Sequence, residues 1–199
     1  MENENIDQVS KKERNELKRA EKQQKREQEI RIKKIKSWLP WIAFAGIIVG
    51  LMYWAVTVAQ KAEESRPGEA VSIMGAQHIA PEQEHEPYNS NPPTSGPHAG
   101  SIPWGFNSEE ILDENVIHNL EHGGVWITYK NLDDESVAIL ENIARRNSFS
   151  VVVSPREAND ANVAVASWGR LMKLDSVDEE RITDFIRRNK NKSPEQLAI

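Results

Sequence analysis

The distribution of apolar residues divides the chain into three parts. Residues 1–37 are dense in charge, contain neither Gly nor Pro, and have too few apolar residues for a buried face. Residues 38–59 are uncharged and mostly apolar, and about 20 such residues span the hydrocarbon core of a bilayer. From residue 60 onward, apolar and polar positions mix in short periodic segments. This pattern predicts a charged arm that is partly helical or disordered, one transmembrane helix and an outer domain.

The apolar segment has the ends expected of a membrane helix. Trp38 and Trp41 at one end, and Tyr53 and Trp54 toward the other, suit the two membrane interfaces. We expect Pro40 in the first turn of the helix, where its missing N–H costs little. A cleaved signal peptide is the alternative, but its apolar core would be shorter and would not follow a long charged arm. An uncleaved single-pass anchor is therefore favoured.

The charge is distributed unevenly along the chain and predicts its orientation. The formal net charge is -6, which combines about +4 in residues 1–36 with about -10 in the rest. The positive-inside rule therefore places the N-terminus in the cytoplasm and residues 60–199 outside the cell membrane. Basic residues beside the bilayer also attract anionic lipid, at about 1 kcal/mol each. No aromatic residues alternate with these charges, so we expect no nucleic acid partner.

Small residues in the membrane segment indicate a self-association motif. Gly46 and Gly50 form a GxxxG pattern, which lets two helices approach closely. We therefore expect a weak homodimer through this helix.

The outer part of the chain predicts an α+β domain. We expect a short linker at residues 60–76 and a domain from residue 77 to the end. The first 30 residues of this domain are rich in Pro, Gly, Ser and Asn and predict a long irregular loop, which is usually functional or disordered. One or two helical turns are expected at 109–115. The remaining pattern predicts strands at 124–129, 149–154 and 162–166, the last continuing to 174, and helices at 133–146 and 178–189. We expect a small mixed sheet covered by two helices.

All five histidines lie in and beside this loop, and the chain has no cysteine. Thiolate sites are therefore excluded. Imidazole nitrogen suits copper and zinc, and no organic cofactor is expected. His118 and His122 are four residues apart, so on a helical turn they share a face. Glu121 between them is expected to ligate or to orient a ligand histidine. The predicted metal ligands are His78, His98, His118 and His122.

Several neighbours are expected to shape this site. Tyr88 is expected to hydrogen-bond the irregular loop around the histidines. Gly96 is expected to supply an unusual backbone angle, and the residues around it to form a stiff turn. The predicted loop-shaping residues are Pro93, Thr94, Ser95, Gly96, Pro97 and Gly123.

Two long motifs carry a resemblance to a known family. The sequences are Pro-Pro-Thr-Ser-Gly-Pro-His, ending at His98, and His-Asn-Leu-Glu-His-Gly-Gly, starting at His118. With the later Val-Ala-Ser-Trp-Gly-Arg and Pro-Glu, they resemble the domain of unknown function 3105, a prokaryotic family with an extracytoplasmic domain behind an anchor helix. His85 does not match the pattern, and Ser167 stands where Thr is more usual. The matching positions are His78, Tyr88, Pro92 to His98, His118, Leu120 to Gly123, Tyr129, Pro155, Ala166, Trp168 to Arg170, Pro194 and Glu195.

The resemblance implies no established activity, and the residues leave three functions open. The first is a metal-binding module with an accessory role, such as delivering metal or binding a protein partner in the cell envelope. The second is a metal-dependent hydrolase, because residues 118–122 match the H-x-x-E-H motif. That motif needs a long helix, whereas Gly123 and Gly124 follow it at once. The third is a metal-free structural or interaction module in which histidines hydrogen-bond the loop.

Overall fold

The computed structural model describes residues 2–198, with side chains described from residue 14 onward. The chain forms two compact units, one ending at Glu64 and the other beginning at Ser65. Each unit is described by itself.

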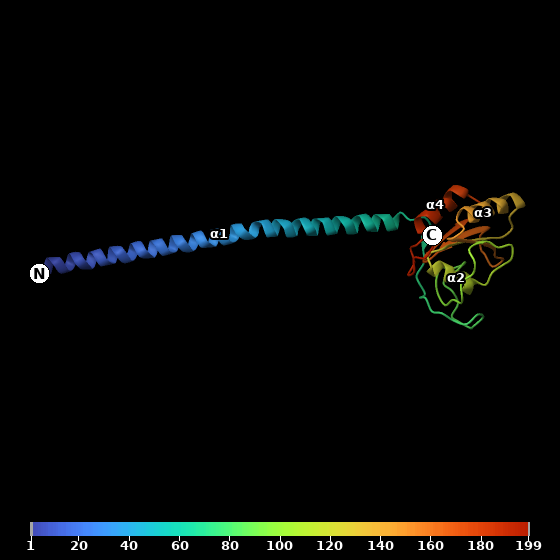
Figure 1. Ribbon diagram of the computed structural model, residues 1–199, viewed down its shortest axis with the longest axis horizontal. Coiled ribbons are helices and arrows are strands. Elements are labelled where there is room, and N and C mark those ends of the chain that lie inside the picture. The colour runs from blue at the N-terminus through green and yellow to red at the C-terminus, as the bar shows by residue number, and fades with distance from the viewer. Residues whose placement is uncertain (1, 199) are drawn as a thin grey trace. The chain divides into compact units, whose positions relative to one another are not determined.

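The first unit is a single helix, α1, from Glu2 to Glu64 (Figure 1). Of the two expectations for the arm, helix and disorder, the structure shows helix. Pro40 lies inside this helix and not in its first turn as predicted, because the helix-forming arm continues directly into the apolar segment. Among the described residues, α1 is the one helix long and apolar enough to cross a membrane, and a signal sequence near an N-terminus has the same properties.

The second unit contains one six-stranded mixed sheet, and the predicted α+β class is confirmed. The strand order is β1-β6-β5-β3-β4-β2, with parallel pairing between β3 and β4 and between β4 and β2, and antiparallel pairing elsewhere. The strands are β1 (Glu69–Ala70), β2 (Gly105–Phe106), β3 (Val125–Tyr129), β4 (Val151–Pro155), β5 (Val163–Ser167) and β6 (Arg170–Leu174).

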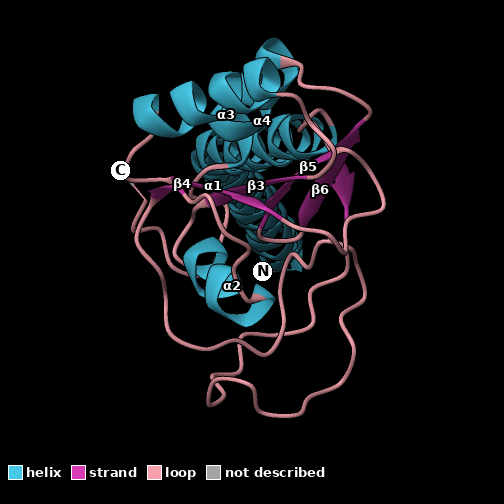
Figure 2. Ribbon diagram, turned by 90° about the vertical axis from the view of Figure 1, so that its right-hand side faces the viewer, coloured by secondary structure: helices cyan, strands magenta, loops and turns pink. Residues whose placement is uncertain are grey.

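Helices lie on both faces of the sheet, as Figure 2 shows. The helices are α2 (Asp113–Glu121), α3 (Asp134–Arg146) and α4 (Glu179–Asn189). The alternation of strand side chains separates two apolar clusters. Val125 and Ile127 pack under α3 and α4, whereas Trp126 packs with Val116 and Ile117 of α2 on the opposite face. The predicted two covering helices are α3 and α4, and α2 is a third.

Three local expectations differ from the structure. The predicted linker at 60–76 is not a separate segment, because its first residues complete α1 and Glu69–Ala70 pairs with β6. The predicted turns at 109–115 form a longer helix that begins only at Asp113. The strand predicted through residue 174 is two strands, because Gly169 adopts a positive φ of 67° and turns the chain back.

Candidate metal centre

Helix α2 presents two of the predicted ligands from its last turn. His118 lies one turn before His122, which follows the helix as its C-terminal cap, and their ring centroids are 4.5 Å apart. Gly123 has a φ of 91°, the left-handed conformation that commonly ends helices. The H-x-x-E-H segment therefore lies at the end of a nine-residue helix and not inside a long one, in agreement with the two glycines that follow it.

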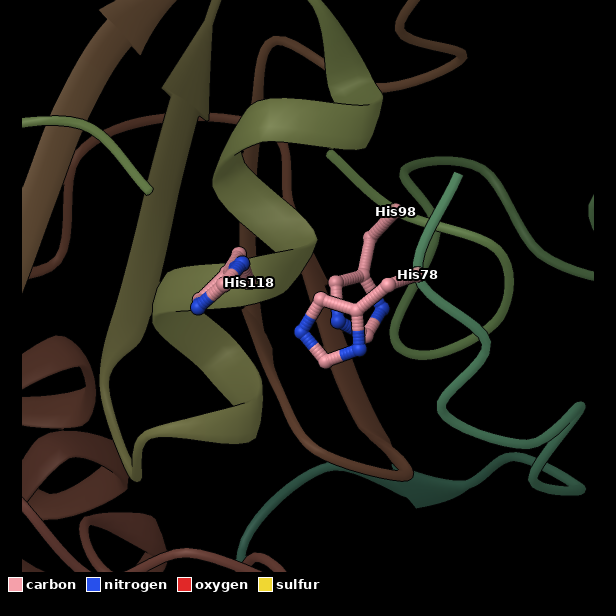
Figure 3. A group of neighbouring side chains, drawn as sticks. All are labelled: His78, His98 and His118. Atoms are coloured by element: carbon pink, nitrogen blue, oxygen red, sulfur yellow. The ribbon is translucent and has the colours of Figure 1, made fainter. Parts of the chain in front are cut away.

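The irregular loop delivers two more histidines to the same place. The segments that carry His78 and His98 run parallel as an isolated bridge, with Ile79 N–H donating to the His98 carbonyl at 2.8 Å and His98 N–H donating to the Gln77 carbonyl at 2.9 Å. Figure 3 shows His118 on its helix and the two loop histidines beside it. The His78 ring centroid is 4.5 Å from that of His98 and 5.1 Å from that of His118.

Backbone carbonyls orient two of these rings. Nδ1 of His98 lies 2.9 Å from the Gly96 carbonyl oxygen, and Nδ1 of His118 lies 2.6 Å from the Ala99 carbonyl oxygen. A carbonyl oxygen can only accept, so each Nδ1 carries the proton and donates. In both rings this leaves Nε2 as the nitrogen that faces a further partner, which for His98 is Oε2 of Glu121 at 3.0 Å.

Glu121 is buried among these histidines, with an exposed fraction of 5%. Its Oε2 lies 3.0 Å from Nε2 of His98 and 3.8 Å from Nε2 of His78. Two donor atoms that share one ion at bond lengths of about 2.0–2.2 Å lie roughly 3–4 Å apart. The carboxylate therefore occupies a position from which it can itself ligate.

The structure brings the predicted ligands together in two overlapping groups. The donor atoms of His78, His98 and His118 lie within 4.8 Å of one another, as do those of His118, Glu121 and His122. His118 belongs to both groups. The first group contains an exposed, a buried and a half-buried residue, so it is open to solvent on the side of His78.

The end of the described chain adds a residue that was not predicted for the site. Nε2 of His122 lies 3.0 Å from Oε2 of Glu195. The backbone N–H of Glu195 donates to the Glu121 carbonyl at 3.1 Å, and that of Leu197 to the His122 carbonyl at 3.0 Å. The only sequence signal for Glu195 was its place in the Pro-Glu pair that closes the family pattern.

A second residue that the sequence did not indicate holds α2 against the loop. The side chain of Asn119 is buried and pairs with both backbone groups of one residue. Its Oδ1 accepts from Ile102 N–H and its Nδ2 donates to the Ile102 carbonyl, each at 3.0 Å. This clamp fixes the helix that carries His118.

His85 lies outside both histidine groups. Its Nδ1 lies 2.7 Å from the Glu86 carbonyl oxygen, and its Nε2 lies 3.6 Å from Glu114 Oε1. Its ring packs beside Tyr88, with the centroids 4.7 Å apart. This is the one histidine that was not predicted to belong to the site.

Tyr88 hydrogen-bonds the histidine loop as expected. Its hydroxyl donates to the Pro97 carbonyl at 2.7 Å, directly before His98. Burial, followed by the negative charges of Glu114 and Asp113, raises the pKa of Tyr88 above its ordinary value of 10.0. The phenol therefore stays protonated and remains a donor.

The predicted loop-shaping residues form a buried turn. Gly96 has a φ of 127°, and a Cβ there would meet the Tyr88 ring at 3.0 Å. The Ser95 hydroxyl accepts from Met74 N–H at 3.0 Å, and the Thr94 carbonyl accepts from Gly169 N–H at 3.3 Å. These contacts position the Gly96 carbonyl that orients His98. Pro93, Thr94 and Ser95 are buried, and Pro97 is partly buried.

Residues 78–199 match the model of a family described as "Protein of unknown function (DUF3105)". The match covers more than half of the chain, so the chain belongs to this family, and the family predicted from the two histidine motifs is confirmed. Comparison with curated proteins gave no match, and comparison with solved structures gave none.

Proposed function

We propose that the outer unit is a membrane-anchored metal-binding module that holds copper or zinc through its histidine cluster. The observation that carries this proposal is the pair of Nδ1–H bonds from His98 and His118 to backbone carbonyls. Histidines that ligate metals almost always donate the other ring N–H in this way. The bonds fix Nδ1 as the protonated nitrogen of both rings and turn both Nε2 atoms toward the cluster, where that of His98 faces Glu121 Oε2 at 3.0 Å.

The remaining donors suit the same ions. His78 is mostly exposed, with 61% of its side chain accessible, so its ring can turn to tighten the group around an ion. Glu121 supplies a buried negative charge that offsets the charge of a dication. Imidazole and carboxylate together suit zinc or Cu²⁺, and the chain has no cysteine to favour a thiolate site.

We place this module outside the cell membrane as a proposal from the charge pattern. The uncharged segment at 38–59 follows an arm with a net charge of about +4, and such an excess of Lys and Arg stays in the cytoplasm. The role that fits best is accessory, either delivering metal or binding an envelope protein.

We also propose a weak homodimer through α1. A Cβ added at Gly46 or at Gly50 would meet no heavy atom within 4 Å, so a second α1 helix has room to approach there.

Hydrolysis is a weaker alternative for the same residues. In H-x-x-E-H hydrolases the glutamate is a general base that acts on water. Here Glu121 Oε2 lies 3.0 Å from His98 Nε2, and α2 ends at Glu121. This geometry favours a ligand role for the glutamate. A metal-free network is the other alternative, with His98 held between the Gly96 carbonyl and Glu121.

The test is the metal content of the full chain. The protein is purified in detergent without a histidine tag, reloaded separately with Zn²⁺ and Cu²⁺, and measured by elemental analysis. We expect tightly bound metal in the wild type, and less bound metal in His118→Ala and in His78→Ala. His85→Ala is the matched control and should bind like the wild type, because its Nε2 faces Glu114 instead. Absence of bound metal after both reloadings would leave the histidines as a structural network.

A further inference from the structure

The histidine cluster offers more donors than a single ion uses. Copper and zinc sites in proteins typically take three or four protein ligands. In the cluster the described chain gathers five side chains with imidazole or carboxylate donors, and a sixth, Glu195, contacts His122. The five are His78, His98, His118, His122 and Glu121.

These donors divide into two sets in space. His78 and His98 come from the loop, and both have Nε2 within 4 Å of Glu121 Oε2. His122 instead directs its Nε2 to Glu195, 3.0 Å away. The first set is therefore built from the loop, and the second from the end of α2 and the end of the described chain.

His118 is shared between the two sets. It belongs to one group with His78 and His98, and to another with Glu121 and His122. Its Nδ1 donates to the Ala99 carbonyl, so Nε2 is its one nitrogen with a lone pair. This residue can therefore ligate one ion and not two.

Glu121 lies between the two sets. Its carboxylate contacts His98 and His78 on one side and is also within 4.8 Å of the donor atoms of His118 and His122. A carboxylate has two oxygens and can bridge two ions, which in two-metal sites lie about 3.5–4 Å apart.

The position of Glu195 is built into the fold. Beyond its own N–H bond to the Glu121 carbonyl, the backbone N–H of Ala198 donates to the His122 carbonyl at 3.0 Å, and that of Asn191 to the Gly123 carbonyl at 2.9 Å. The end of the described chain is thus fastened along the C-terminus of α2. That end of a helix carries partial negative charge and favours a cation.

We propose that the cluster is a dinuclear site, in which Glu121 bridges two divalent metal ions. One ion is held by His78, His98 and Glu121, and the other by His122, Glu195 and Glu121, with His118 ligating one of the two. This inference rests on the proposed metal-binding function and specifies its stoichiometry. The ion without His118 has three protein ligands, so it keeps an open position for a small oxygen ligand or substrate.

The experiment counts ions per chain. The full chain in detergent, without a histidine tag, is saturated with Zn²⁺, freed of excess metal, and analysed for zinc and protein. We expect two ions in the wild type and in His85→Ala, and one in Glu195→Gln, in His122→Ala and in His78→Ala. Glu195 and His78 are more than half exposed as side chains, so these two variants test the proposal without disturbing the core. Circular dichroism of each variant checks that it is folded.

Replacing zinc by Co²⁺ gives a second readout. Two cobalt ions joined by a carboxylate are magnetically coupled, so we expect an altered spin-resonance signal in the wild type. The signal of an isolated ion should appear in Glu195→Gln. One zinc per wild-type chain would overturn the dinuclear proposal and leave the metal-binding function intact. A wild-type chain without zinc would overturn both the metal-binding function and the dinuclear site. Two ions retained in Glu195→Gln would show that Glu195 is not a ligand of the second ion.

Discussion

At the scale of single residues, the site depends on Gly123, a position that has no room for a side chain. Gly123 connects the helix that carries the histidines to β3, and its φ of 91° is a conformation that L residues rarely adopt. A Cβ at this position would overlap Oδ1 of Asn191 and come within 3.0 Å of its Cα. Because Gly123 has no side chain, Asn191 can pack against it, and the end of the described chain can lie beside His122.

We expect Gly123→Ala to destabilise the outer unit. The left-handed conformation alone costs an L residue roughly 1–2 kcal/mol, and the overlap with Asn191 adds to it because Asn191 is itself bonded to Ala198. The measurement is the denaturant midpoint by near-ultraviolet circular dichroism. Gly100→Ala is the matched control, since a Cβ there meets nothing within 4 Å. Equal midpoints for the two variants would contradict this account.

At the scale of elements, the histidine loop is held by side chains rather than by regular pairing. Residues 77–98, all of them described, form no strand or helix beyond the single bridge between His78 and His98. Tyr88 hydrogen-bonds the Pro97 carbonyl, and Asn89 donates to the Ser72 carbonyl at 2.7 Å. The geometry of the site therefore depends on a few polar contacts, and on Tyr88 remaining protonated.

This dependence predicts a loss of stability at alkaline pH. The folded state raises the pKa of Tyr88 above 10.0, so the contribution of Tyr88 is complete below the unfolded pKa of about 10 and is lost as the pH rises through the higher folded pKa. We expect the free energy of unfolding, measured in urea at a series of pH values, to fall progressively above about pH 10.

The variant Tyr88→Phe separates this effect from general alkaline unfolding. It should be less stable at neutral pH by about 1 kcal/mol, through the lost hydrogen bond, but should lose less stability above about pH 10. Some alkaline loss should remain, because burial also raises the pKa of Tyr129. If the free energy of unfolding of Tyr88→Phe fell above about pH 10 as steeply as that of the wild type, Tyr88 would be excluded as the source of the alkaline loss of stability.

At the scale of the whole molecule, periodic patterns predicted most of the sheet and its helices, whereas pairings between distant segments were not accessible. Strand β3 and helices α3 and α4 fall where the alternation and the helical spacing placed them. Strands β1 and β2 have two residues each, which is too short for any period. The histidine motifs indicated the predicted ligands, but the approach of Glu195 to His122 depends on the fold of the whole unit.

The orientation of the chain across a membrane is the remaining prediction at this scale. The excess of Lys and Arg in the arm should hold it in the cytoplasm, because moving those charges across the bilayer is costly. The chain has no cysteine, so single cysteines report position without background. We expect Ala158→Cys, an exposed position in the outer unit, to react with an impermeant maleimide in intact cells. Gln24→Cys, exposed on α1 and neutral in charge, should react only after permeabilisation.

The two cysteine variants together distinguish three arrangements of the chain. Labelling of Ala158→Cys alone in intact cells supports an external histidine cluster, which can exchange metal with the medium or with envelope proteins. The reverse pattern would place the cluster in the cytoplasm, and the accessory role proposed for the envelope would not hold. Release of the outer unit as a shorter soluble chain would instead identify α1 as a cleaved signal sequence. In that case Gly46 and Gly50 would be absent from the mature protein, and the predicted homodimer through α1 would be lost with them.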